Sequence, residues 1–189
     1  MEPTLPYTIN RIAYTPEQIT SRIQALGKQI SADYAHDEDL VVVGVLKGSF
    51  YFMSDLTRVL EVPVILDFMG VSTYPTSTSR QGIVRITKDL DVEITGKHVL
   101  LIEDIIRTGL TTAYLVKNIQ AKDPKSVRIC TLLINQDQLL IQLPIAYKGF
   151  EITETRLIGY GMDADEKGRT LPYIAEIKKK VEEPAPTDA

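Results

Sequence analysis

The stretch HVLLIEDIIRTGLTT, residues 98–112, decides the fold class of this chain. Its apolar run at residues 99–102 predicts a strand buried on both faces, as in a parallel sheet. Glu103 and Asp104 follow directly, and a Thr/Gly turn then leads into a pattern typical of a helix. A strand, a short turn and a helix in this order are the repeating unit of parallel α/β sheets.

The polar residues of this stretch suit a phosphorylated sugar. Two adjacent carboxylates at a strand end can face a sugar diol or a metal ion. A turn containing Thr108 and Gly109 at the start of a helix presents backbone N–H groups, which bind phosphate. We therefore expect a phosphorylated sugar held with a divalent cation. The alternative is a buried strand with a polar capping turn, which has no need of two adjacent acids.

Strand and helix patterns extend outward from this stretch in both directions. Strands are predicted at residues 40–46, 62–71, 83–86, 98–102, 127–134 and 156–160, and helices at residues 15–32, 49–60 and 111–122. This alternation predicts an α/β domain with a mostly parallel central sheet flanked by helices, spanning residues 1–177. Ligands of such sheets bind beyond the carboxyl ends of the strands, where Lys47, Gly48, Glu103 and Asp104 would all lie.

Composition narrows the function classes. With 24% charged residues and a net charge of −4, the chain has no bias toward nucleic acid or a membrane surface. No apolar run is long enough to cross a bilayer, and no signal peptide is visible, so we expect a cytoplasmic protein. Its one cysteine, Cys130, lies in an apolar segment and is expected in the core. Residues 178–189, KKKVEEPAPTDA, are expected to be a charged, disordered tail.

Residues 98–112 resemble the phosphoribosyl-diphosphate (PRPP) signature of type I phosphoribosyltransferases: an apolar run, two acids, two apolar residues, then x-Thr-Gly-x-Thr. The chain is most similar to the hypoxanthine-guanine branch, from about Tyr7 to Ile177. The resemblance implies a type I phosphoribosyltransferase fold with a small hood and a flexible lid loop. It also implies magnesium-dependent transfer of the phosphoribosyl group from PRPP to a purine base in purine salvage, by a homodimer or homotetramer.

The resemblance assigns the phosphate and sugar contacts. Glu103 and Asp104 would accept hydrogen bonds from the ribose hydroxyls and help to place Mg²⁺, which pairs with few carboxylates and keeps its waters. Lys47 and Gly48 match the pyrophosphate loop of the family, in which the Leu-Lys peptide is often cis. The 5′-phosphate would be wrapped by the turn residues Thr108, Gly109, Leu110 and Thr111.

A second block of sequence resembles the closing segment of the family. Gly-Tyr-x-x-Asp at residues 159–163 is followed six residues later by Arg169. In the family this Asp reaches the magnesium ion, which predicts Asp163 as a metal residue. Arg169 would hold the pyrophosphate. The Ser/Thr-rich segment at residues 71–85 is predicted to form the lid, with Thr73 and Tyr74 where the family has Ser-Tyr; a plain solvated hairpin loop is the alternative.

Three positions depart from the family, and all concern the base. Arg107, counted here with the catalytic residues, replaces an Asp proposed to manage a proton on the purine, and arginine cannot act as a base. Asn135 stands where the family has a Lys that donates to the purine 6-oxo group. Arg156 aligns with an aromatic residue that stacks on the base. We predict that Asn135, Arg156 and the neighbouring Leu157 contact the base.

These departures keep two alternatives open. One is a phosphoribosyltransferase that uses another base, such as adenine, xanthine or a non-purine. The other is a non-catalytic protein that binds PRPP or a nucleotide and regulates a partner. Because the sugar, phosphate and metal residues match the family while only the base residues differ, we favour a working PRPP site.

Overall fold

The computed structural model describes residues 7–36, 39–76, 79–154 and 156–179. The elements run in the order β1 (Tyr7–Tyr14), α1 (Pro16–Asp33), β2 (Leu40–Leu46), α2 (Phe50–Arg58), β3 (Val64–Thr76), β4 (Ser79–Lys88), β5 (His98–Ile106), α3 (Leu110–Gln120), β6 (Ser126–Ile134), the 3₁₀ turn η1 (Gln136–Gln138), β7 (Ile145–Glu151), β8 (Leu157–Ile158) and β9 (Ile174–Lys179). Among these residues no helix is long and apolar enough to span a membrane.

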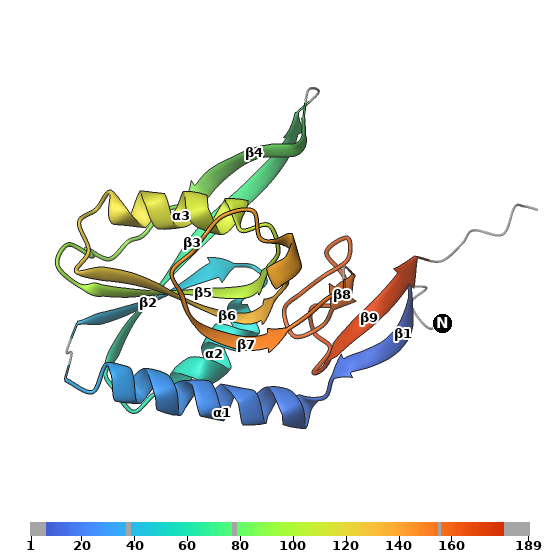
Figure 1. The fold of residues 1–189 in the computed structure, drawn as a ribbon, viewed down its shortest axis with the longest axis horizontal. Coiled ribbons are helices and arrows are strands. Elements are labelled where there is room, and N and C mark those ends of the chain that lie inside the picture. The colour runs from blue at the N-terminus through green and yellow to red at the C-terminus, as the bar shows by residue number, and fades with distance from the viewer. Residues whose placement is uncertain (1–6, 37–38, 77–78, 155, 180–189) are drawn as a thin grey trace, which may run out of the picture.

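A six-stranded sheet forms the centre of the molecule, in the order β4-β3-β2-β5-β6-β7 (Figure 1). The pairs β2–β3, β2–β5, β5–β6 and β6–β7 are parallel, and only β4 is antiparallel to its neighbour. The prediction of a mostly parallel α/β sheet is confirmed. Because β2 and β5 lie side by side, the carboxyl ends of both strands meet at one edge of the sheet.

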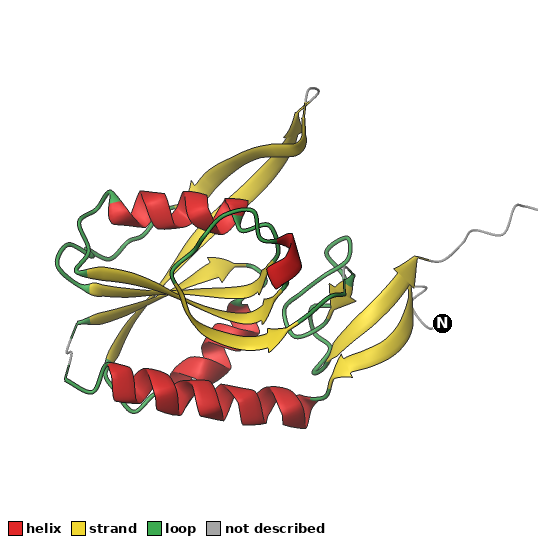
Figure 2. Cartoon of the chain, viewed as in Figure 1, coloured by secondary structure: helices red, strands yellow, loops and turns green. Residues whose placement is uncertain are grey.

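Helices cover both faces of this sheet, with α1 and α2 on one side and α3 on the other (Figure 2). Successive residues of the central strands point to opposite faces of the sheet. Val42 and Leu100 pack in the core with α1 and α2, while Val41 and Val99 pack in the core with α3. Both sets are fully buried, which explains why β2 and β5 read as continuous apolar runs in the sequence. Cys130 lies in the first of these cores, as predicted.

A small antiparallel sheet, β1-β9-β8, lies beside the carboxyl-end edge and forms the hood (Figure 1). Pairing of Tyr7 with Lys179 and of Tyr14 with Ile174 joins the two ends of the described chain. We did not predict β1 or β9 of this sheet as strands, nor β7 of the central sheet, whereas β8 lies within the strand predicted at residues 156–160. Lys178 and Lys179 were assigned to the disordered tail, but both belong to β9; residues 180–189 lie outside the described part.

The segment predicted as a lid loop is an antiparallel hairpin of β3 and β4, which projects from the sheet (Figure 1). Thr73 pairs with Val84 and Tyr74 with Ile83, while residues 77–78, at its tip, lie outside the described residues. At its base, the buried carboxylate of Asp67 accepts hydrogen bonds from the backbone N–H groups of Asp91 and Val92. The arms of this segment are therefore regular strands; closure over a ligand stays a prediction.

Candidate active site

The site begins where β2 and β5 cease to pair. Their ladder ends at Gly44 and Ile102, whereas β5 stays paired with β6 as far as Ile106. The strand therefore runs four residues past its predicted end, and Glu103 and Asp104 lie inside it, along an edge that β2 has left. This extension could not be read from the sequence, because two acids in succession interrupt the apolar run.

The Lys47–Gly48 turn fills part of the space that opens between these strands. The Leu46–Lys47 peptide is cis, as the resemblance implied. Gly48 lies against the carboxylate of Asp104, so closely that a Cβ atom at residue 48 would be 1.9 Å from Asp104 Oδ2. Only a glycine allows this approach. The turn after β2 and the acids of β5 thus form one continuous surface.

A cavity of about 280 Å³ lies at this surface. Its lining comes from the turn after β2, the acids of β5 and the start of α3, and includes Gly48, Glu103, Asp104, Arg107, Thr108, Gly109, Thr111 and Thr112. Gly109 is the residue that precedes the first turn of α3, so the N–H groups of that turn face the same region. The structure thus brings four of the predicted phosphate residues, Gly48, Thr108, Gly109 and Thr111, together with the acids, whereas Lys47 does not line this cavity. Leu110 begins α3 but does not line the cavity.

Burial perturbs both acids. Glu103 is 6% exposed. Burial, together with the nearby charge of Asp104, raises its pKa to about 8, although a hydrogen bond of 3.0 Å from Thr112 Oγ1 opposes the rise. Burial also raises the pKa of Asp104 to about 6, against the backbone N–H of Ile105 and the charge of Arg169, which lower it. Two adjacent carboxylates with raised pKa values form a site that gains from a bound cation.

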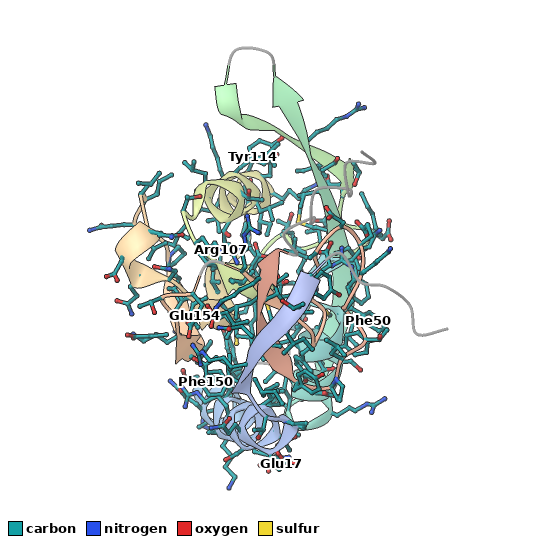
Figure 3. The ribbon with its side chains drawn as sticks, turned by 90° about the vertical axis from the view of Figure 1, so that its right-hand side faces the viewer. Glu17, Phe50, Arg107, Tyr114, Phe150 and Glu154 are labelled. Atoms are coloured by element: carbon teal, nitrogen blue, oxygen red, sulfur yellow. The ribbon has the colours of Figure 1, made fainter. Side chains whose placement is uncertain are left out.

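A second, larger cavity of about 440 Å³ adjoins the first under the hood. Its lining includes Tyr7, Asp104, Arg107, Arg156, Leu157, Met162, Asp163, Asp165 and Ile177. Asp104 and Arg107 line both cavities and therefore stand between them. In Figure 3, which looks onto the hood side, Arg107 lies below α3 and beside the hood strands. Burial lowers the pKa of Arg107, and the charge of Asp104 opposes that effect.

The second sequence block packs directly onto the first. Gly161 has a φ of +101°, and a Cβ there would lie 2.0 Å from the carbonyl oxygen of Gly48. Arg169 is held in this segment, because its Nη1 donates to the Gly161 carbonyl over 2.8 Å and its Nη2 lies 2.9 Å from Asp163 Oδ1. The structure therefore brings Arg169 and Asp163 to the Lys47–Gly48 turn, as the resemblance implied.

The predicted base residues are only partly brought together. Arg156 and Leu157 line the larger cavity. Asn135 does not line either cavity; it is buried, and its Oδ1 accepts from the Gln138 N–H over 3.2 Å, capping η1. Its position therefore gives the prediction of base contact no support. Thr73 and Tyr74 lie in β3, where their backbones pair with β4.

Some residues of the site were not predicted. Tyr7 and Ile177 line the larger cavity from β1 and β9, two of the strands that we missed. Their alternating pattern is short and weakly apolar, which gave no strand signal. Met162 and Asp165 lie within the second block, yet nothing in their type or spacing marked them as lining residues. Glu166, which contacts both Lys47 and Arg169, was also missed.

The acids fit a magnesium ion shared with a substrate better than a metal site made by the protein alone. Within the described ranges, no three His, Cys, Asp or Glu side chains are grouped to hold a metal. Asp104 and Asp163 both line the larger cavity, and Asp104 also lines the smaller one. Magnesium commonly takes one or two carboxylates plus substrate phosphates and water, which matches this sparse donor set.

Comparison with known proteins supports the same interpretation of this site. Residues 14–165 match the family model described as the phosphoribosyl transferase domain. The hypoxanthine-guanine phosphoribosyltransferase of Mycobacterium tuberculosis H37Rv is 43% identical over 181 residues, covering 93% of this chain and 90% of that protein. The enzyme of that name from Bacillus subtilis is 37% identical over 179 residues, covering 95% of this chain and 99% of that protein.

The solved structures that resemble this chain are of the same kind of protein as these relatives. A hypoxanthine-guanine phosphoribosyltransferase of Bacillus anthracis superposes with a TM-score of 0.84 at 40% identity, covering 89% of this chain and 99% of that one. The hypoxanthine phosphoribosyltransferase of Trypanosoma cruzi gives a TM-score of 0.85 at 34% identity, covering 93% of this chain and 94% of that one.

Proposed function

The chain belongs to the phosphoribosyltransferase family, and on that premise we propose that it transfers the 5-phosphoribosyl group of PRPP to a purine base of the hypoxanthine or guanine type, releasing pyrophosphate, in purine salvage. The observation that carries the proposal is the pair of adjoining cavities. One combines two acids with the turn at the start of α3, the other lies under the hood, and Asp104 and Arg107 stand between them.

Each cavity supplies one half of the reaction. In the smaller one, the turn at residues 108–111 binds the 5′-phosphate, and Glu103 and Asp104 accept hydrogen bonds from the ribose hydroxyls. The base enters the larger cavity. A purine nitrogen then attacks the anomeric carbon, forming the C–N bond as the bond to pyrophosphate breaks, and the proton lost from the imidazole ring passes to water. Lys47 and Arg169 hold the departing pyrophosphate and offset the negative charge that builds on it.

A magnesium ion belongs to this proposal. Asp104 and Asp163 are the residues that would hold it, with Glu103 nearby. When bound, the ion would neutralise phosphate charge and favour departure of pyrophosphate. The raised pKa values of the two adjacent acids of β5 support a cation at this place, because a cation would favour their ionised forms.

A second candidate is a phosphoribosyltransferase with a different base, and a specific observation favours it. Two guanidinium groups, Arg107 and Arg156, line the larger cavity. Neither can accept a proton from the incoming base. A base that already carries negative charge, such as ionised xanthine, needs no such acceptor and gains from positive charge. Adenine and non-purine bases remain alternatives, as does a protein that binds PRPP without turnover.

The test is pyrophosphate release from PRPP and magnesium, measured across hypoxanthine, guanine, xanthine, adenine and uracil. Release with hypoxanthine or guanine supports the proposed function, and release with xanthine alone supports the second candidate. The Asp104→Asn variant serves as the control for each active base and should lose at least about 100-fold in kcat/KM. Binding of PRPP without release for any base would replace the enzyme by a regulator.

Two further features are proposed from the family. We expect the protein to act in the cytoplasm, where the single buried Cys130 would remain a reduced thiol. We also expect a homodimer or homotetramer, which sedimentation equilibrium would test.

A further inference from the structure

The two cations assigned to pyrophosphate already share an anion from the protein itself. Oε2 of Glu166 lies 3.0 Å from Nζ of Lys47 and 3.1 Å from Nη2 of Arg169. One carboxylate oxygen therefore bridges cations from the turn after β2 and from the segment before β9. Two positive side chains this close would otherwise repel each other, and an oxygen shared between them is also how a phosphate group would bind.

The backbone at Glu166 is arranged to present this side chain. Ala164 and Lys167 exchange backbone hydrogen bonds of 3.0 and 3.1 Å, which closes a turn with Asp165 and Glu166 at its centre. The φ angles of these two residues are 52° and 62°. A turn with positive φ at both central residues favours Asn or Asp followed by Gly, so Asp165 suits it and Glu166 does not. Glu166 thus has a backbone conformation that is unfavourable for its residue type.

We propose that Glu166 is an internal substitute for pyrophosphate. In the ligand-free protein its carboxylate binds Lys47 and Arg169. The pyrophosphate group of PRPP displaces the carboxylate on binding, and the carboxylate returns when pyrophosphate leaves. This inference rests on the proposed function and deepens it, because it assigns a role to a residue that neither the sequence motifs nor the relatives marked. Glu166 is a positioning residue, since it acts on the reaction through the two cations.

The exposure of the partners makes such an exchange feasible. The side chains of Glu166 and Lys47 are 66% and 67% exposed, so their ion pair is weak and readily replaced. Arg169 is 22% exposed and keeps its contacts with Gly161 and Asp163 when Glu166 leaves. A pyrophosphate carries more charge and more acceptor oxygens than one carboxylate. Glu166 thus keeps the cations in place at the expense of some affinity, and competes with the product for the same two groups.

Binding of inorganic pyrophosphate in the presence of Mg²⁺, measured by isothermal titration calorimetry, tests the inference. The Glu166→Gln variant keeps the shape of the side chain and removes its charge. We expect it to bind pyrophosphate about 3–10-fold more tightly than the wild type, because the competing anion is gone. Glu61→Gln is the matched control: it makes the same substitution at an exposed glutamate just before β3, and Glu61 lines neither cavity. It should change the affinity by less than about twofold.

A second variant guards against an effect on the turn. Asn favours positive φ, so Glu166→Asn relieves the backbone while removing the charge, and it should also bind pyrophosphate more tightly than the wild type. In turnover, Glu166→Gln should lower the KM for PRPP and strengthen product inhibition by pyrophosphate by a similar factor. A merely structural role would change neither in this direction.

The outcomes separate this inference from the proposed function. If the wild type binds pyrophosphate and Glu166→Gln binds it no more tightly than Glu61→Gln does, the inference is wrong and the proposed function stands. The same conclusion follows if Glu166→Gln binds more weakly. If the wild type does not bind pyrophosphate with magnesium at all, both fail.

Discussion

At the scale of single residues, the site depends on two close approaches of the backbone. Gly48 lies against the Asp104 carboxylate, and Gly161 lies against the carbonyl of Gly48. The three groups form a stack from β5 through the turn after β2 to the closing segment. A side chain added within this stack would move groups of the proposed PRPP site without disturbing either hydrophobic core.

The Gly48→Ala variant should therefore separate activity from stability. Its Cβ would lie 1.9 Å from Asp104 Oδ2, so the carboxylate must move. A displacement of about 1 Å at a reacting centre can cost about 100-fold in rate, and we expect a loss of that order in kcat/KM for PRPP. Urea unfolding should change by less than about 1 kcal/mol. Gly96→Ala is the control for turnover alone. Its φ of +72° strains any side chain and should lower stability, but an added Cβ there meets no atom within 4 Å, so turnover should be kept. Comparable loss of turnover in both variants would refute the argument.

The sequence could predict the grouping of residues that are close together in the chain. It could not predict contacts between residues that are far apart in it. Glu103, Asp104 and the residue 108–111 turn form one motif, so their grouping could be predicted. The capping role of Asn135 depends on η1, which has no signal of its own. The bridge from Glu166 to Lys47 joins segments far apart in the chain, and no spacing rule predicts such a contact.

At the scale of elements, the predicted helices are close to those observed because their ends carry explicit signals. Thr15 caps α1 by accepting from the Gln18 N–H, and Gln18 returns a hydrogen bond to the Thr15 N–H. The strands β2 to β6 were also recovered, the central ones because burial on both faces leaves continuous apolar runs. The edge strand β7 was missed, because only one of its residues is buried. The long hood strands β1 and β9 were missed because they are largely exposed or half-buried and pair with sequence-distant partners, whereas β8 lies within the strand predicted at residues 156–160.

Removing the cap should weaken α1 by a predictable amount. Thr15→Ala deletes the acceptor for the Gln18 N–H, and we expect a loss of about 0.5–1 kcal/mol in the free energy of unfolding. Thr15→Ser keeps the hydroxyl and should lose less. Chemical denaturation of the two variants measures the difference; equal stabilities would show that the capping box contributes nothing.

The β3–β4 hairpin should give the protein an acid-sensitive anchor at Asp67. Burial alone would raise the pKa of Asp67, but hydrogen bonds from the N–H groups of Val92, Phe68 and Asp91 and from Lys88 outweigh it and hold the pKa below its ordinary value of 3.8. A depressed pKa contributes stability that is present above the unfolded pKa and is lost as the pH falls through the folded pKa. The contribution should therefore be complete at pH 7 and decline below about pH 4.

Comparison with Asp67→Asn measures that contribution. At pH 7 we expect the variant to be less stable by about 2 kcal/mol, because it loses the ion pair with Lys88 and a charged acceptor for buried N–H groups. The difference should shrink toward pH 3. Asp39→Asn, which removes an exposed carboxylate 3.4 Å from Lys97, is the control and should show little difference at either pH. A constant difference for Asp67→Asn across this range would contradict the assignment.

At the scale of the whole molecule, the two adjoining cavities lie where the central sheet meets the hood. The smaller cavity lies at the edge of the central sheet. The larger cavity is lined by residues of β5, of the closing segment and of both long hood strands. The architecture of the sheet followed from the sequence pattern, but the hood did not. A ligand that bridges both cavities should therefore stabilise the folded state as a unit.

PRPP with magnesium should raise the melting temperature. At a ligand concentration of 100 times Kd, binding adds about 2.7 kcal/mol to stability. For a domain of this size that corresponds to about 5–10 °C. Scanning fluorimetry with and without magnesium measures the shift. Asp104→Asn should lose most of it, and a full shift in that variant would exclude Asp104 from the binding site.

The pairing of β1 with β9 has a consequence for biosynthesis. Tyr7 and Ile177, from the first and last described strands, face the same cavity. Chains emerge from the ribosome with the N-terminus first, so β1 must wait for its partner until nearly all of the described chain has been translated. The turn at residues 108–111 precedes β9 by more than 60 residues, and β7, the last strand of the central sheet, also precedes it. A nascent chain would therefore form the walls of the smaller cavity before β1 and β9 can pair and close the larger one.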